Sequence, residues 1–342
     1  MSGMRAWRLP AGCTSVDQLE LVELPIPHPG PQDVLVRVHA NSLNFRDQAI
    51  AAGRYGGGPI KAAGVPLSDG AGVVADVGSN VTTLKVGERV AGAFFPQWRG
   101  GPPSAARGPA LGCPPAAGML SDYVVLPATG LVRLASSLSF EQAATLPCAG
   151  VTAWNALMAG PQPLQPGQSV LLIGTGGVSL LALQIARAIE ARVVVISSSD
   201  AKLARVRALG ADATLNHRSE PLWGSRVAEL AGGGIDHVVE VGGLGTLAQS
   251  IQAVGFGGEV ALIGVLAMHG EVNPMPLMGK AASLRGIFVG PVGMADELNR
   301  FVDAHRLQPI VDRTFAFLDA KAAYAYQASA ALFGKVVIVN SS

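Results

Sequence analysis

The feature that most constrains this chain is a glycine-rich turn between two strongly apolar segments, in VLLIGTGGVSLLALQIARAIEARVVVI at 170–196. The segments VLLI (170–173) and VVVI (193–196) are uninterrupted apolar runs, as expected for parallel strands that helices cover on both faces. Apolar residues recur between them at every third or fourth position: Val178, Leu181, Ala182, Ile185, Ala186 and Ile189. This spacing predicts a helix with one apolar face, and hence a strand–turn–helix–strand unit of an α/β fold.

The turn that links the first strand to this helix predicts a dinucleotide-binding site. Its residues are Gly174, Thr175, Gly176, Gly177 and Val178. Glycines tolerate positive φ and let the backbone approach a pyrophosphate without a clashing Cβ. The N–H groups and the dipole at the helix start then attract the anion. A merely tight turn is the alternative, but the position between two buried strands favours the binding site.

The remaining sequence predicts two regions of different texture. ATLN, DHVVEV, EVALIG and LRGIFVG predict four more strands after 197, and six strands fit a doubly wound, Rossmann-type parallel sheet. Residues 1 to about 130 carry short strands between prolines and glycines, which predicts a compact β-barrel or sandwich. Within that region, 98–118 lacks periodicity and is predicted to be a long surface loop.

The C-terminal region predicts two helices and a final strand. The helices are MADELNRFVDAHR and LDAKAAYAYQASAAL, joined by a short connection through Gln308 and Pro309. The strand KVVIV follows them, and we expect it to return to the first domain. The predicted fold class is therefore α/β, with a Rossmann sheet and a separate β-rich domain.

The end of the second strand bears on which dinucleotide fits. It carries Ser197, Ser198 and Ser199, with Lys202 one turn later. Sites for NAD usually place a carboxylate there, whereas hydroxyl groups and a cation suit the 2′-phosphate of NADP. His217 and Arg218, after the third strand, can add charge from the next loop. NADPH is therefore favoured over NADH; the alternative is that Ser199 or Asp200 simply caps the following helix.

Composition excludes several classes of protein. A chain of 342 residues is longer than one core usually supports, so two domains are expected. The net charge of +1 leaves no electrostatic footprint for nucleic acid or anionic lipid. No secretory signal or long apolar span is evident, and three widely spaced cysteines indicate a reducing cytoplasm rather than a disulfide framework.

Four motifs together resemble the medium-chain dehydrogenase/reductase family. They are VGERV, LPCAGVTAW, GTGGV and FGKVVI, and the resemblance covers essentially the whole chain. It implies a GroES-like catalytic domain at 1–148, to which 291–342 returns, and a Rossmann domain at 149–290. In this family the active site lies in the cleft between the two domains, and a homodimer commonly forms through the strand that LRGIFVG matches.

The zinc enzymes of the family bind catalytic zinc through three residues, and only one is retained here. The matching positions hold Asn44, Ser68 and Cys148, with Asp69 at the position of an acidic neighbour. An amide, a hydroxyl and one thiol do not meet the needs of zinc. The family's structural zinc lobe would fall in 98–118, which holds only Cys113. The chain therefore resembles the zinc-independent branch, and no metal is expected. Cys148 is interpreted mainly as a packing residue. The alternatives are a redox or substrate contact and a metal ligand.

Without a metal, hydrogen-bond donors must stabilise the charge that hydride addition places on oxygen. SLNFRD resembles a motif of quinone oxidoreductases in which Asn44 supplies an amide donor, and Tyr55 matches a tyrosine lining the cleft. Arg46 is expected to face either the pyrophosphate or the substrate oxygen. Structural alternatives remain: Asp47 as the N-cap of a short helix closed by Gly53, and ordinary packing for Asn44 and Tyr55. Ser68 can likewise bond only to the backbone.

The resemblance also places residues beside the cofactor. They are Phe45, Cys148, Thr152, Gly242, Val265, Val289, Gly290, Gly334 and Lys335. The main hypothesis is a cytoplasmic, zinc-independent, NADPH-preferring oxidoreductase that reduces a quinone, an enone, or an aldehyde or ketone. The rivals are a zinc-free NAD-dependent alcohol dehydrogenase and a non-catalytic NADPH-binding regulatory or structural protein.

Overall fold

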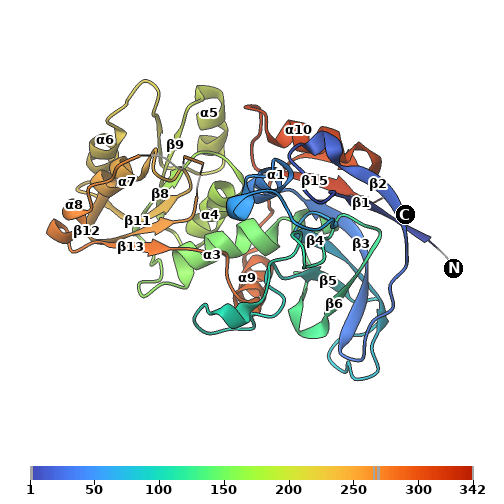
Figure 1. Ribbon diagram of the computed structural model, residues 1–342. Helices are drawn as coiled ribbons and strands as arrows, with labels where there is room; N and C mark the ends of the chain where they lie inside the picture. Colours follow the sequence, from blue (N-terminus) through green and yellow to red (C-terminus); the bar gives the residue numbers. More distant parts are fainter. Residues whose placement is uncertain (1–2, 265, 268–269, 341–342) are drawn as a thin grey trace. The chain divides into compact units, whose positions relative to one another are not determined.

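The computed structural model describes residues 3–264, 266–267 and 270–340. The chain divides into two compact units, residues 1–151 with 289–342, and residues 152–288 (Figure 1). No helix among the described residues is both long enough and apolar enough to cross a membrane.

The second unit is a six-stranded parallel sheet with the strand order β10-β9-β8-β11-β12-β13. The strands are β8 (Ser169–Ile173), β9 (Arg192–Ser197), β10 (Ala213–Asn216), β11 (Ile235–Glu240), β12 (Val254–Leu262) and β13 (Ser283–Gly286). All six match the predicted strands. The order reverses between β8 and β11, which is the point where dinucleotides bind in such sheets.

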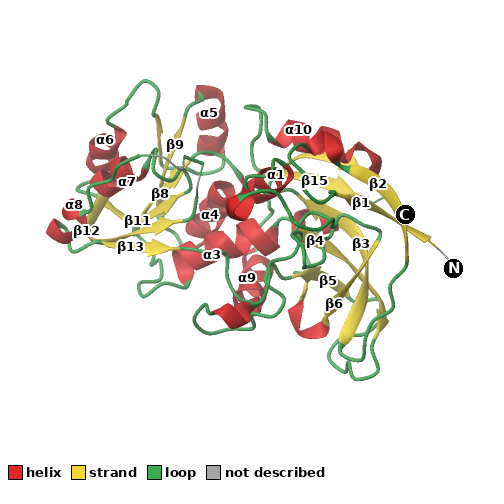
Figure 2. Ribbon diagram, in the orientation of Figure 1, coloured by secondary structure: helices red, strands yellow, loops and turns green. Residues whose placement is uncertain are grey.

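Helices separate these strands, as the alternating pattern predicts (Figure 2). They are α3 (Val151–Met158), which begins at the unit boundary, α4 (Gly177–Ala188), α5 (Asp200–Ala208), α6 (Trp223–Leu230), α7 (Leu247–Ala253) and α8 (Met275–Gly279). Strand β8 is buried along its whole length, and α4 packs its apolar face against β8 and β9. Burial of both sheet faces explains why the strands are continuous apolar runs.

The first unit is built on a mixed sheet with the order β14-β15-β3-β4-β5-β7, to which β6 adds beside β3. The strands are β3 (Asp33–Ser42), β4 (Asp69–Val77), β5 (Arg89–Gly92), β6 (Tyr123–Pro127), β7 (Leu131–Arg133), β14 (Val311–Ala316) and β15 (Lys335–Val339). A separate hairpin pairs β1 (Gly3–Arg8) with β2 (Glu20–Pro25). The helices are α1 (Phe45–Ala51), α2 (Phe140–Ala143), α9 (Val292–His305) and α10 (Ala320–Gln327).

The predicted return of the C-terminal strand is confirmed. Strand β15 pairs antiparallel with β3, with Val337 opposite Ser42, and parallel with β14. Strand β14 lies where only a short connection was expected. Its VDRTFA sequence is half-exposed and weakly patterned, so pairing with β15 rather than local preference makes it a strand.

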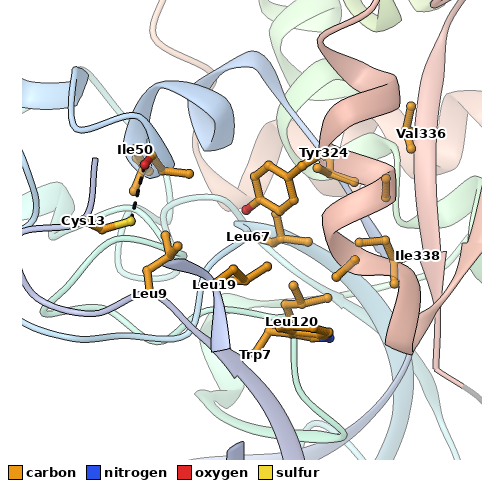
Figure 3. Packing of buried hydrophobic residues seen from close by; sticks show 14 of the residues in the cluster. Trp7, Leu9, Cys13, Leu19, Ile50, Leu67, Leu120, Tyr324, Val336 and Ile338 are labelled. Carbon is orange, nitrogen blue, oxygen red and sulfur yellow. Dashed lines mark hydrogen bonds between the residues drawn. The ribbon is translucent and has the colours of Figure 1, made fainter. Parts of the chain in front are cut away.

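One apolar core of the first unit joins its N-terminal segment, α1, α10 and β15 (Figure 3). Trp7 donates its indole N–H to the Phe317 carbonyl at 2.8 Å, and the thiol of Cys13 donates to the Ala51 carbonyl at 3.4 Å. The ring of Tyr324 extends from α10 into this core. The bond from Cys13 and the burial of Ile50 and Ala51 hold the C-terminal end of α1 against this core.

The segment 98–118 is irregular apart from a single 3-10 turn at Ala105–Arg107, as predicted. The prediction of a surface loop is wrong at Leu111, Gly112 and Gly118, which are buried. Leu111 is only 2% exposed, and its N–H donates to the Phe94 carbonyl at 3.0 Å. Arg46 at the start of α1 donates to the Leu111 carbonyl at 2.7 Å, so the segment is anchored at the base of that helix.

Candidate active site

The N-terminus of α1 lies at the centre of the predicted catalytic motif. Asn44 is the N-cap, with φ −124° and ψ 160°, and Asp47 accepts the Asn44 N–H at 2.7 Å. The expectation that Asp47 is itself the N-cap is therefore wrong. In SLNFRD, Asn44 is a favourable cap residue, and the acid three positions later reaches back to its N–H. Gly53, with φ +66°, follows the helix end as predicted.

The ammonium group of Lys335 lies against this N-cap. Its Nζ donates to the Leu43 carbonyl and to Oδ1 of Asn44, both at 2.5 Å, and the residue is 5% exposed. Lys335 opens β15 and follows Gly334, whose φ is +94° and whose missing Cβ would lie 2.6 Å from the Ile310 carbonyl oxygen. The bend at Gly334 and the pairing of β15 with β3 thus position the lysine.

Three further polar residues complete the site. Ser68 donates its hydroxyl to Oδ1 of Asp69 at 2.8 Å, so it bonds to a carboxylate rather than only to backbone. The Cys148 N–H donates to Oδ2 of Asp69 at 3.2 Å. We call the set of Asn44, Asp47, Ser68, Asp69, Cys148 and Lys335 the polar cluster. These residues come from four separate segments of the chain, all within the first unit.

Burial controls the charges in the polar cluster. Burial raises the pKa of Asp47 to about 6, against the opposing effects of Arg46 and Lys335. Burial also raises the pKa of Asp69, although Lys335 and Asn44 lower it in part. The pKa of the Cys148 thiol is raised by burial and by the Asp69 charge, so this sulfur remains a thiol at neutral pH.

The polar cluster does not provide a fitting set of zinc ligands. The oxygen of Asn44 already accepts from Lys335, and the Ser68 hydroxyl donates to Asp69. A lysine ammonium beside the prospective ligands would also repel a divalent cation. Among the residues that the structure describes, no group of three or more His, Cys, Asp or Glu side chains is placed to hold a metal ion.

Arg46 and Tyr55 form a stacked arrangement next to the polar cluster. The Arg46 guanidinium lies 5.0 Å from the centre of the Tyr55 ring and 4.9 Å from that of Phe94. With its bond to the Leu111 carbonyl, this places Arg46 as a brace between α1 and the 98–118 segment. Phe45, at the first position of α1, is instead 50% exposed.

In the second unit, the glycine-rich turn has the form that an anion site needs. Gly174 has φ +76° and donates its N–H to the Ile196 carbonyl at 2.7 Å. Gly176 is the N-cap of α4 and supplies no side chain, so the first-turn N–H groups of Gly177 and Val178 have no side-chain cap. No heavy atom lies within 4 Å of the positions that a Cβ on Gly174 or Gly176 would occupy. The turn, with Thr175 buried in it, therefore fits a pyrophosphate.

The carboxyl end of β9 carries the predicted serines. Ser197 is buried, Ser198 and Ser199 are half-buried, and the Ser199 hydroxyl accepts the Lys202 N–H at 3.4 Å. The capping role of Ser199 is thus confirmed. Burial, followed by the nearby Arg218, lowers the pKa of His217, so His217 adds no positive charge at neutral pH.

A buried carboxylate that the sequence interpretation missed organises the loop after β11. Glu240 is fully buried and accepts from the N–H groups of Gly242 at 2.7 Å and Gly243 at 3.0 Å. The hydroxyls of Thr246, at 2.6 Å, and Ser250 also donate to it. The signal was an acid at the end of a buried strand, followed by glycines and hydroxyl residues at helical spacing.

The other residues expected beside the cofactor lie in both units. Thr152 is 3% exposed and lies in α3. Val289 has φ +52°, an uncommon conformation for a β-branched residue, and precedes Gly290 in the first unit. Val265 lies outside the described residues.

Comparisons with known proteins agree with this architecture. Residues 30–136 match the alcohol dehydrogenase GroES-like domain, and residues 177–304 match the zinc-binding dehydrogenase model. The second range, despite the name of its model, includes none of the three positions matched to zinc ligands, which are Asn44, Ser68 and Cys148. A zinc-type alcohol dehydrogenase-like protein of Schizosaccharomyces pombe is 42% identical over 336 residues, covering 94% of this chain and 95% of its own.

A second curated relative and a solved structure are also similar to this chain. A quinone oxidoreductase-like protein 2 homolog of Nematostella vectensis is 31% identical over 266 residues, 76% of this chain and 66% of its own. A crystal structure of a candidate alcohol dehydrogenase from Sinorhizobium meliloti 1021 has a TM-score of 0.90 and 40% identity, and covers 99% of both chains. Members of this family bind nicotinamide cofactors. The chain therefore belongs to the medium-chain dehydrogenase/reductase family and is an oxidoreductase of the alcohol dehydrogenase and quinone oxidoreductase type.

Proposed function

We propose that this protein is a zinc-independent, NADPH-preferring reductase of aldehydes or ketones, enones or quinones. The observation that carries the proposal is the polar cluster, in which a lysine ammonium and an amide stand where a metal would need ligands. When bound, NADPH supplies a hydride to the acceptor carbon. The reaction then takes up one proton, so that a carbonyl, for example, becomes an alcohol while NADPH becomes NADP⁺.

The chain's own residues have separate parts in this proposal. Gly176 and the first-turn N–H groups of α4 would hold the pyrophosphate. Ser197 and Ser198, with Lys202, would hold the 2′-phosphate, since no carboxylate occupies the end of β9. Asn44 would donate an amide hydrogen to the acceptor oxygen as negative charge develops on it. Tyr55, which stacks on Arg46 next to the polar cluster, would line the acceptor site, and Phe45 would lie beside the cofactor.

Acceptor turnover in the presence of a chelator tests the proposal. Purified protein treated with EDTA and passed over a desalting column is mixed with NADPH or NADH and a panel of aldehydes, ketones, enones and quinones. We expect NADPH oxidation with at least one acceptor class, a larger kcat/KM for NADPH than for NADH, and no change on adding Zn²⁺. Activity lost with EDTA and restored by stoichiometric Zn²⁺ would overturn the metal-free part.

The same assay separates the rival functions. A preference for NADH and for alcohol oxidation would identify a zinc-free alcohol dehydrogenase. Tight NADPH binding with no turnover on any acceptor would indicate a cofactor-binding protein without catalysis.

We also propose a cytoplasmic homodimer. Support for the dimer comes from β13, an edge strand of the second unit, where Leu284 is 42% exposed. Phe256 and Met278, exposed by 84% and 72%, add apolar surface on β12 and α8. Unpaired strand edges with apolar side chains favour pairing with a second copy. Light scattering after size exclusion should give twice the chain mass, and Leu284→Lys should give a monomer.

The three free cysteines support the proposed cytoplasmic location, because a reducing compartment keeps thiols free.

A further inference from the structure

Lys335 makes two hydrogen bonds that determine how the Asn44 side chain is oriented. Its Nζ lies 2.5 Å from Oδ1 of Asn44 and 2.5 Å from the carbonyl of the preceding residue, Leu43. An amide group has an acceptor on one side and a donor on the other. If the Asn44 amide were rotated by 180°, its NH2 group would face the ammonium, and two hydrogen-bond donors would repel each other. Lys335 therefore allows one orientation of the amide.

In that orientation, the nitrogen of Asn44 is turned away from Lys335. Asn44 is 8% exposed, and its Nδ2 is buried without a well-formed hydrogen bond to any residue that the structure describes. One of its two hydrogens is directed at Asp69, because a side-chain hydrogen bond from Asn44 lowers the pKa of that carboxyl. A buried donor left without an acceptor costs about 1–3 kcal/mol. Only the second Nδ2 hydrogen lacks an acceptor among the described residues, and an oxygen of the bound acceptor would supply one.

The charge of Lys335 also offsets the neighbouring acids. Asp47 and Asp69 are both fully buried, and Lys335 lowers the pKa of each. The lysine thus combines two effects at one point: it orients a neutral donor, and it compensates the carboxylates behind that donor. A negatively charged oxygen on the acceptor would otherwise meet the field of two acids.

We propose that Lys335 is a positioning residue for the reduction, acting through Asn44: it holds the amide so that Nδ2–H points at the acceptor oxygen. This rests on the proposed function of Asn44 as the donor to that oxygen. The alternative is a purely structural lysine that joins β15 to the β3–α1 junction, with no influence on the chemistry.

A double-mutant cycle distinguishes these roles. The variants are Lys335→Met, Lys335→Arg, Asn44→Ala and the double variant Asn44→Ala/Lys335→Met, each assayed for kcat and KM with the best acceptor. We expect Lys335→Met to lower kcat at least tenfold with little change in KM, and Lys335→Arg to restore most of it. In the Asn44→Ala background, Lys335→Met should change kcat by less than twofold, because the residue through which it acts is gone.

Two controls keep the experiment decisive. Thermal unfolding and NADPH affinity, measured by fluorescence, report on folding and on the cofactor site of the second unit. If Lys335→Met does not fold, Lys335→Arg and Lys335→Gln carry the cycle, since both retain hydrogen-bond donors and only Arg retains the charge. Equal fold-losses of kcat in the wild-type and Asn44→Ala backgrounds would overturn the inference while the proposed function stands. A wild-type protein with no turnover on the whole acceptor panel would overturn both.

Discussion

The glycine-rich turn of the second unit and the polar cluster of the first unit are built in opposite ways. The turn is a run of consecutive residues that offers backbone N–H groups and needs the absence of side chains. The cluster gathers side chains from segments as far apart as Asn44 and Lys335, and hydrogen bonds link the side chains of Ser68 and Asp69 and those of Asn44 and Lys335. A network of buried polar groups such as the polar cluster depends on every member.

The largest expected effect comes from the donor of the polar cluster. Asn44→Ala should lower kcat by about 10²–10³, the usual effect of removing one donor to a developing oxyanion. NADPH affinity should be unchanged, because the expected phosphate contacts lie in the second unit. Steady-state kinetics and fluorescence titration measure both. Asn80→Ala, at an exposed asparagine of the first unit, is the matched control. Unchanged kcat in Asn44→Ala would remove Asn44 from the chemistry.

A second test uses Asp47, the buried acid that accepts the backbone N–H of Asn44. The pKa of Asp47 is raised by burial from 3.8 to about 6, so the ionised form is less stable in the folded state. Stability from this group is complete below pH 3.8 and is lost as pH rises through about 6. Relative to Asp47→Asn, the wild type should therefore lose about 2 kcal/mol of unfolding free energy between pH 4 and pH 7. Urea denaturation at several pH values measures the difference; a pH-independent difference would contradict the buried, ionisable Asp47.

The glycine-rich turn is tested by adding a single methyl group. Gly176 has φ −81°, which alanine also adopts, and there is open space where a Cβ would lie. The cofactor-free Gly176→Ala variant should therefore unfold at the same temperature as the wild type. The methyl group would occupy the space where the pyrophosphate approaches, and the Kd for NADPH should rise at least tenfold, about 1.4 kcal/mol. Gly279→Ala, which also meets nothing within 4 Å, is the control outside the turn. Equal affinity in both variants would argue that the turn does not hold the cofactor.

The smallest effect is expected at the thiol. Cys148→Ala should keep kcat within about twofold and lower stability by about 1 kcal/mol, since its backbone N–H still bonds to Asp69. Iodoacetamide should modify Cys148 slowly at neutral pH, because burial raises the pKa of the thiol. Peptide mass spectrometry and acceptor kinetics check both. Loss of all turnover in Cys148→Ala would restore the nucleophile or metal-ligand interpretations.

Sequence patterns predicted the elements of the second unit well, because each depends on nearby residues. The strands β8 and β9, and the start of α4 within one residue of Val178, followed from apolar runs and glycines. The prediction failed where a distant partner decides the local structure. Strand β14 forms through β15, and Asp47 reaches back to Asn44 instead of capping the helix itself.

The sequence by itself determined the strands and helices of the Rossmann sheet and the glycine-rich turn between β8 and α4, since these follow from local spacing. Only the tertiary structure decided that Lys335, almost 300 residues after Asn44, lies against its amide, that Arg46 braces the 98–118 segment, and that Glu240 anchors the loop carrying Gly242. These contacts arise from strand pairing and burial, which bring together groups whose positions along the chain carry no sign of their proximity.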